Sequence, residues 1–123
     1  LFRSGEQDTA GEFTMSVVVA DNDRERSAQA VVQEAAAALP FAVTYVVEPD
    51  QNIAKARNKA VLASAGEFIA FIDDDELPQR DWLSTAWQAC SITQAPIGTM
   101  SPRCSATGIC VNFRKSASGM TLV

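Results

Sequence analysis

The 123-residue sequence contains no histidine, and its three cysteines form no Cys-x-x-Cys pair. Zinc sites depend on these residue types, and a disulfide framework needs paired cysteines, so we expect neither, and we expect a reducing, cytoplasmic setting. No apolar run approaches the roughly 20 residues that cross a bilayer. Lys and Arg number 10 against 15 Asp and Glu, a net charge of −5 that argues against nucleic-acid binding.

The length and a hydrophobic content of 47% allow one domain with a single core. The chain begins at Leu1 without methionine or a signal-peptide pattern, which suggests a fragment of a longer protein. Residues 1–13 are polar and contain glycine, and they are expected to be irregular or a remnant of an upstream helix. From residue 93 onward proline, glycine, serine and threonine interrupt any periodicity, apart from one short strand expected at 109–113.

Between these two segments, strand patterns alternate with helix patterns. One helix is expected to start after Asp23 as its cap, with an apolar stripe that includes Val31 and Val32; a second is expected from Asn52 as N-cap to Gly66 as C-cap. A third helix is expected over 81–92. The β-branched and apolar runs predict strands at 15–20, 43–47 and 68–72. This order predicts an α/β fold, a three-layer sandwich with a mostly parallel sheet.

Four consecutive acidic residues follow the third predicted strand: Asp73, Asp74, Asp75 and Glu76. In an extended turn, Asp73 and Asp75 share a side and can converge on one ion, while Asp74 points elsewhere. Oxygen ligands suit Mg²⁺ or Mn²⁺, which can bridge to a diphosphate. The alternative interpretation is a solvated acidic loop in front of the helix that carries Trp82.

Two further residues are predicted at the same edge of the sheet, where ligands of such folds bind. Asp21 ends the first predicted strand and can accept a hydrogen bond from a ribose or a base; alternatively it only forms the turn. Arg57, in the second helix, can pair with Asp73 or a phosphate. Its alternative is an exposed basic helix face shared with Lys55 and Lys59.

Several segments, taken in order, resemble family 2 glycosyltransferases of the GT-A fold, especially the bacterial glucosyltransferases that assemble succinoglycan-type exopolysaccharides. They are Val17-Val-Val-Ala-Asp-Asn22, Asn52-Ile-Ala-Lys-Ala-Arg-Asn58, Gly66 through Pro78 with its run of acids, and Asp81-Trp-Leu83. The resemblance covers about residues 14 to 90. It identifies residues 14–92 as the donor-binding core of an incomplete GT-A-like domain.

The resemblance implies a nucleotide-sugar donor, UDP-linked, bound with Mg²⁺ or Mn²⁺, and inverting transfer to a saccharide or lipid-linked saccharide acceptor. Asp21 matches the acid that contacts the nucleoside, and Arg57 matches an arginine that supports the donor pocket. Asp73 and Asp75 match the D-x-D pair, with Asp75 as metal ligand; Asp74 is included among the donor-binding residues. The implied location is the cytoplasm, at the inner face of the membrane.

Three family features are missing: the first strand, the later acidic base and the acceptor-binding half. We therefore expect little or no transferase activity from this chain alone, and the catalytic base is unassigned. Two other functions stay open. One is a phosphoacceptor receiver domain, with Asp73 at the third strand's end but no Lys-Pro pair on a later strand. The other is a non-catalytic remnant that self-associates to cover an unpaired strand edge.

Overall fold

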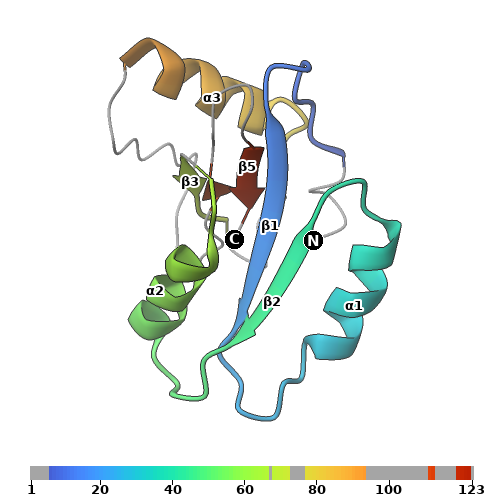
Figure 1. Ribbon diagram of the computed structural model, residues 1–123, viewed down its shortest axis with the longest axis vertical. Helices are drawn as coiled ribbons and strands as arrows, with labels where there is room; N and C mark the ends of the chain where they lie inside the picture. The colour runs from blue at the N-terminus through green and yellow to red at the C-terminus, as the bar shows by residue number, and fades with distance from the viewer. Residues whose placement is uncertain (1–5, 67, 73–76, 94–110, 113–118, 123) are drawn as a thin grey trace.

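The computed structural model describes residues 6–66, 68–72, 77–93, 111–112 and 119–122 (Figure 1). Strands and helices alternate along most of the chain. Among the described residues, no helix combines the length and the apolar character needed to cross a bilayer. In chain order the elements are β1 Thr14–Asp21, α1 Gln29–Ala38, β2 Val43–Val47, α2 Ile53–Ala63, β3 Ile69–Ala70, α3 Trp82–Thr93, β4 Val111–Asn112 and β5 Gly119–Leu122.

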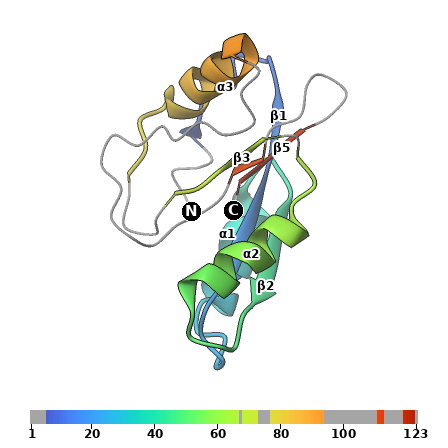
Figure 2. The same ribbon diagram turned by 90° about the vertical axis from the view of Figure 1, so that its left-hand side faces the viewer.

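The strands form one sheet in the order β2-β1-β5-β3-β4. β1 is parallel to β2 and to β5, β5 is parallel to β3, and β4 runs antiparallel to its neighbours. Helices α1 and α2 lie on opposite sides of the sheet, and α3 lies near the start of β1 (Figures 1 and 2). The predicted α/β class with a mostly parallel sheet is therefore confirmed.

Successive residues of β1 face opposite sides of the sheet, as the pleat requires. Val17, which is fully buried, packs with Leu83 and Trp87 of α3. Val18, also fully buried, packs with Ala60 of α2 on the other face. A strand with apolar residues on both faces belongs inside the sheet, which is where β1 lies.

β5, from the C-terminal end of the chain, pairs with β1 on the side away from β2. It covers the strand edge that the sequence analysis left unpaired. Thr14 pairs with Gly119 and Val17 pairs with Leu122 in parallel register. Local pattern did not predict β5, because four residues with a glycine and a threonine carry no clear strand signal. The strand expected at 109–113 is present in part, as β4.

Several local predictions hold and others are wrong. The strand at 43–47 and the Asn52 cap are confirmed: the Asn52 side chain accepts hydrogen bonds from the N–H groups of Ala54 and Lys55. Asp23 does not cap α1, which begins at Gln29 without a side-chain cap. Gly66 does not end α2, because Ser64 is its C-cap residue.

Two predicted apolar segments are also shorter or more exposed than the patterns indicate. β3 is assigned only to Ile69–Ala70 of the expected strand at 68–72. On α1, Val32 is buried but Val31 is 58% exposed, so the buried stripe is narrower than predicted. α3, at Trp82–Thr93, lies one residue from the helix predicted at 81–92.

Candidate functional site

Asp21 ends β1, and its carboxylate is held by hydrogen bonds from within the chain. The side chain is only 8% exposed. Oδ1 accepts a hydrogen bond from the N–H of Asp23 at 2.9 Å; Oδ2 accepts one from the N–H of Ala28 at 3.1 Å and another from the Tyr45 hydroxyl. The carboxylate thus fixes both ends of the turn between β1 and α1 and joins that turn to β2.

The loop after β1 is tied to the loop after β2 by one amide. Asn22 Nδ2 donates to the carbonyl oxygen of Glu48 at 2.9 Å and to that of Asp50 at 2.5 Å. In addition, the N–H of Glu48 donates to the carbonyl oxygen of Asp21 at 2.8 Å. The two strand ends therefore present a single connected edge, as expected where parallel strands end side by side.

Two lysines of α2 reach back to the loop after β2. Lys59 Nζ donates to the Val47 carbonyl oxygen at 2.5 Å and lies 3.3 Å from Oε2 of Glu48. Lys55 Nζ lies 2.5 Å from Oδ2 of the exposed Asp50. The hydrogen bond from Lys55 lowers the pKa of Asp50, and the same contact raises the pKa of Lys55. Lys55 and Lys59 thus belong to this edge.

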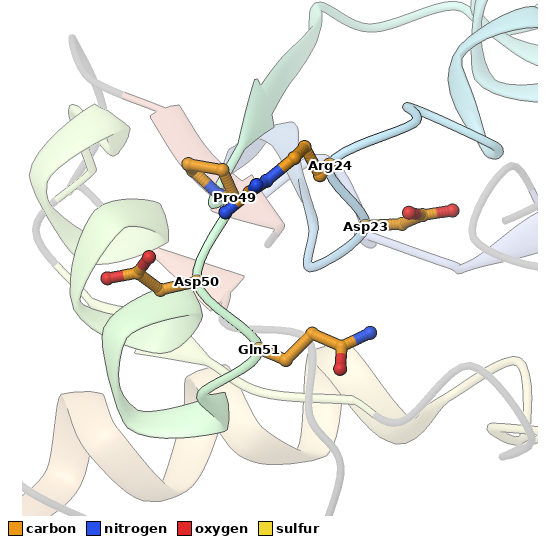
Figure 3. A pocket seen from close by; sticks show the side chains of 5 residues that line it. All are labelled: Asp23, Arg24, Pro49, Asp50 and Gln51. Carbon is orange, nitrogen blue, oxygen red and sulfur yellow. The ribbon is translucent and has the colours of Figure 1, made fainter.

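Between the two loops lies an open pocket of about 410 Å³, which we call the loop pocket (Figure 3). Arg24 extends from the loop after β1 toward Pro49, whereas the Asp50 side chain points away from Arg24 (Figure 3). The Ser27 hydroxyl and the N–H of Glu25 donate to Asp23 and lower the pKa of its carboxyl, which keeps it ionised. The residues that line the loop pocket are Asp23, Arg24, Pro49, Asp50 and Gln51.

Arg57 is in the second turn of α2, is half-buried and does not line the loop pocket. Its guanidinium carbon lies 5.7 Å from the centroid of the Phe71 ring, a cation–π distance. Phe71 precedes Asp73 by two residues in the sequence. The structure therefore brings Arg57 to the segment that leads into the run of acids, and the prediction of a merely exposed basic face does not describe it.

The run of acids itself, Asp73, Asp74, Asp75 and Glu76, lies outside the described residues. Whether Asp73 and Asp75 converge on an ion therefore stays a prediction. In the ranges that the structure does describe, no three Asp, Glu or Cys side chains gather closely enough to hold a metal ion.

Sequence reasoning missed Tyr45, Asn22, Arg24 and Gln51. Tyr45 is in the middle of β2, and its hydroxyl donates to Asp21. Burial, together with that hydrogen bond, raises the pKa of Tyr45 to about 12. The phenol hydroxyl of Tyr45, the third residue of an otherwise β-branched strand, indicated that this side chain needs a hydrogen-bond partner. The partner, Asp21, is 24 residues away in the sequence, so local pattern could not identify it.

Comparison with known proteins gives the family. The model for glycosyl transferase family 2 matches residues 9–99, more than half of the chain. The succinoglycan biosynthesis protein ExoM of Rhizobium meliloti (strain 1021) is 43% identical over 81 residues, which is 66% of this chain and 26% of that protein. The chain thus spans about a quarter of the relative's length, and no solved structure matches it. Because the family model matches more than half of the chain, the chain belongs to glycosyltransferase family 2.

Proposed function

We propose that this chain is the donor-binding part of a GT-A-fold glycosyltransferase and binds a UDP-linked sugar for exopolysaccharide synthesis. The observation that carries the proposal is the family match over residues 9–99, which includes the β1 edge, α2 and the run of acids. It is supported by the relative whose name assigns it to succinoglycan biosynthesis. The connected edge formed by the ends of β1 and β2 is where ligands bind in open α/β sheets.

In this proposal, Asp21 contacts the nucleoside of the donor, Arg57 supports the donor pocket, and Asp73 and Asp74 act nearer the diphosphate. The contact of Arg57 with the ring of Phe71, two residues before Asp73, supports this role for Arg57. Asp21 has a narrower role than the sequence suggests. Three donors from the chain already use most of the roughly four acceptor positions of its carboxylate.

Asp75, with Asp73, is the proposed ligand of Mg²⁺ or Mn²⁺. Carboxylate oxygens are the ligands that these cations prefer, and both cations leave positions for phosphate oxygens. When bound, such a cation supplies Lewis-acid neutralisation of the departing nucleoside diphosphate. The proposed acceptor of an inverting transfer is a saccharide or a lipid-linked saccharide at the inner face of the cytoplasmic membrane.

The test is a thermal-unfolding measurement with UDP, with and without Mn²⁺. Because a ligand that binds only the native state stabilises it, UDP with Mn²⁺ should raise the melting temperature by roughly 10 °C at 100-fold excess over Kd. UDP alone and Mn²⁺ alone should give much smaller shifts.

The Asp75→Asn variant should lose this joint effect while melting at the wild-type temperature in buffer, because a neutral amide is a poor ligand for the cation. Glu12→Gln, an exposed acid before β1, is the matched control and should keep the joint effect. Equal stabilisation by UDP with and without Mn²⁺, or none at all, would contradict a metal-bridged donor site.

A further inference from the structure

Tyr45 and Asp21 lie on the same face of the sheet, on neighbouring strands. Tyr45 is opposite Val19 in the parallel register of β1 and β2, and Asp21 is two residues further along β1. Side chains two positions apart on a strand share a face, so the Asp21 carboxylate is a diagonal neighbour of the phenol ring. Long and aromatic side chains span the distance to a diagonal neighbour, which is how the Tyr45 hydroxyl reaches Asp21.

The two oxygens of the Asp21 carboxylate are used unequally. Oδ2 accepts a hydrogen bond from the N–H of Ala28 at 3.1 Å and another from the Tyr45 hydroxyl. Among the described residues, Oδ1 accepts one hydrogen bond, from the N–H of Asp23 at 2.9 Å. A carboxylate oxygen has about two acceptor positions, so these bonds fill Oδ2 and leave one position on Oδ1. Asp21 is 8% exposed, so its carboxylate is not completely closed off from solvent.

Tyr45 differs from the other two donors in where it is anchored. The N–H groups of Asp23 and Ala28 belong to the turn that Asp21 itself begins, whereas Tyr45 belongs to β2 and ties the carboxylate to the sheet. Burial and the hydrogen bond to Asp21 raise the pKa of Tyr45 to about 12, so the hydroxyl keeps its proton near neutral pH and acts as a donor. Without this hydroxyl, Oδ2 would have a free acceptor position and the carboxylate would lose its link to β2.

We propose that Tyr45 is a positioning residue for donor binding: its hydroxyl occupies Oδ2 of Asp21 and thereby presents Oδ1 as the single acceptor for the nucleoside. This inference rests on the proposed function, because it takes Asp21 as the residue that contacts the nucleoside. In this role Tyr45 acts through Asp21 and need not touch the donor itself. An acceptor that is already oriented costs less to order when a ligand binds, so the hydroxyl contributes to affinity from a distance.

The experiment is isothermal titration calorimetry of the whole chain with UDP and with inorganic pyrophosphate, each in the presence of Mn²⁺. Both ligands carry a diphosphate, but only UDP carries a nucleoside. Tyr45→Phe should weaken UDP binding roughly three- to tenfold, the contribution of one hydrogen bond, and should leave pyrophosphate binding unchanged. A merely structural role of Tyr45 would weaken both ligands equally or weaken neither.

Thr44→Val is the matched control, because it removes one hydroxyl from the adjacent residue of β2, whose side chain is exposed. It should leave both affinities unchanged. The melting temperature of each variant is measured first, and the titrations are run well below the lowest one, so that only folded chains are compared.

A double-mutant cycle tests whether Tyr45 acts through Asp21. Asp21→Asn should itself weaken UDP binding, because an amide has only one acceptor oxygen. Adding Tyr45→Phe to Asp21→Asn should then cause a much smaller loss than Tyr45→Phe causes in wild type, since coupled residues are not additive.

Three results overturn the inference: UDP binding that is unchanged or tighter in Tyr45→Phe, an equal loss for pyrophosphate, or full additivity in the cycle. Any of these, in a chain that binds UDP only with Mn²⁺, leaves the proposed function intact. UDP that binds wild type equally well with and without Mn²⁺, but binds Tyr45→Phe more weakly, supports the positioning role and removes the metal-bridged donor. A wild-type chain that binds no UDP removes both.

Discussion

At the end of the sheet near α3, apolar rings hold the chain together, whereas hydrogen bonds and ion pairs hold the opposite end. Phe13 and Trp87 have ring centroids 5.1 Å apart, and Phe68 lies edge-on to Trp87 at 6.0 Å. At the other end, Asn22 and Asp21 join the loops after β1 and β2. The two ends lie at opposite poles of the molecule in Figure 1.

The difference suggests that the apolar end near α3 contributes most to stability, whereas the hydrogen-bonded loops at the other end present polar groups for binding. Burying aromatic and aliphatic side chains removes water and contributes most of the favourable free energy of folding. Hydrogen-bonded loops contribute less net stability, but they keep polar groups near the surface where a ligand can reach them. Substitutions at the α3 end should therefore lower the free energy of unfolding more than substitutions at the loop end.

The largest expected effect is at Leu83, which is fully buried in the α3 cluster. Leu83→Ala should lower the free energy of unfolding by about 3 kcal/mol, because it removes buried methyl groups and leaves a cavity. Urea denaturation measures the change. Leu62→Ala on α2 is the matched control: Leu62 is 86% exposed, so its loss should change stability by less than about 0.5 kcal/mol. Equal effects of the two substitutions would refute the proposed core.

A smaller effect is expected at Asn52, which caps α2 at the loop end. Asn52→Ala should reduce the free energy of unfolding by about 1 kcal/mol, because the N–H groups of Ala54 and Lys55 lose their acceptor. Asn58→Ala, at an exposed position inside the same helix, should stabilise slightly or do nothing, since alanine is the better helix former. A loss at Asn58 as large as at Asn52 would contradict the capping role.

The smallest expected effect is a change in the pKa of Tyr45, which tests the hydrogen bond from its hydroxyl to Asp21. Tyr45 is the only tyrosine in the chain, so tyrosinate absorbance reports on it alone. The native protein should titrate with a midpoint at about 12, against the ordinary 10.0, and Asp21→Asn should bring the midpoint back toward the ordinary value. A native midpoint at the ordinary value would mean that the Tyr45 hydroxyl does not donate to Asp21.

The same shift predicts a pH dependence of stability. Since folding raises the pKa of Tyr45, the native state holds the proton more tightly than the unfolded state. The associated stabilisation is complete below about pH 10 and is lost as the pH rises toward 12. Tyr45→Phe should remove this alkaline loss, and thermal unfolding across that range measures it.

The predictions that succeeded depend on neighbours in the sequence. The cap at Asn52, the strand Val43–Val47 and the helix over 81–92 each follow from residues within one or two turns. The wrong prediction at the start of α1 shows the same dependence. The Asp23 carboxylate accepts hydrogen bonds from the Ser27 hydroxyl and the N–H of Glu25 instead of capping the helix, and α1 begins only at Gln29. Hydrogen bonds of this kind, between a side chain and nearby residues of its own turn, compete with helix capping.

By itself, the sequence determined the α/β class, the membership in a glycosyltransferase family and the acid at the end of β1, because strand and helix periodicity and motif spacing are local properties. Only the tertiary structure decided that Tyr45 holds Asp21, that Asn22 joins two loops, that Arg57 lies over Phe71 and that β5 enters the sheet beside β1. Each of these contacts joins residues 14 or more positions apart. Chain closure over such distances depends on the packing of the whole sheet, which no short window of sequence contains.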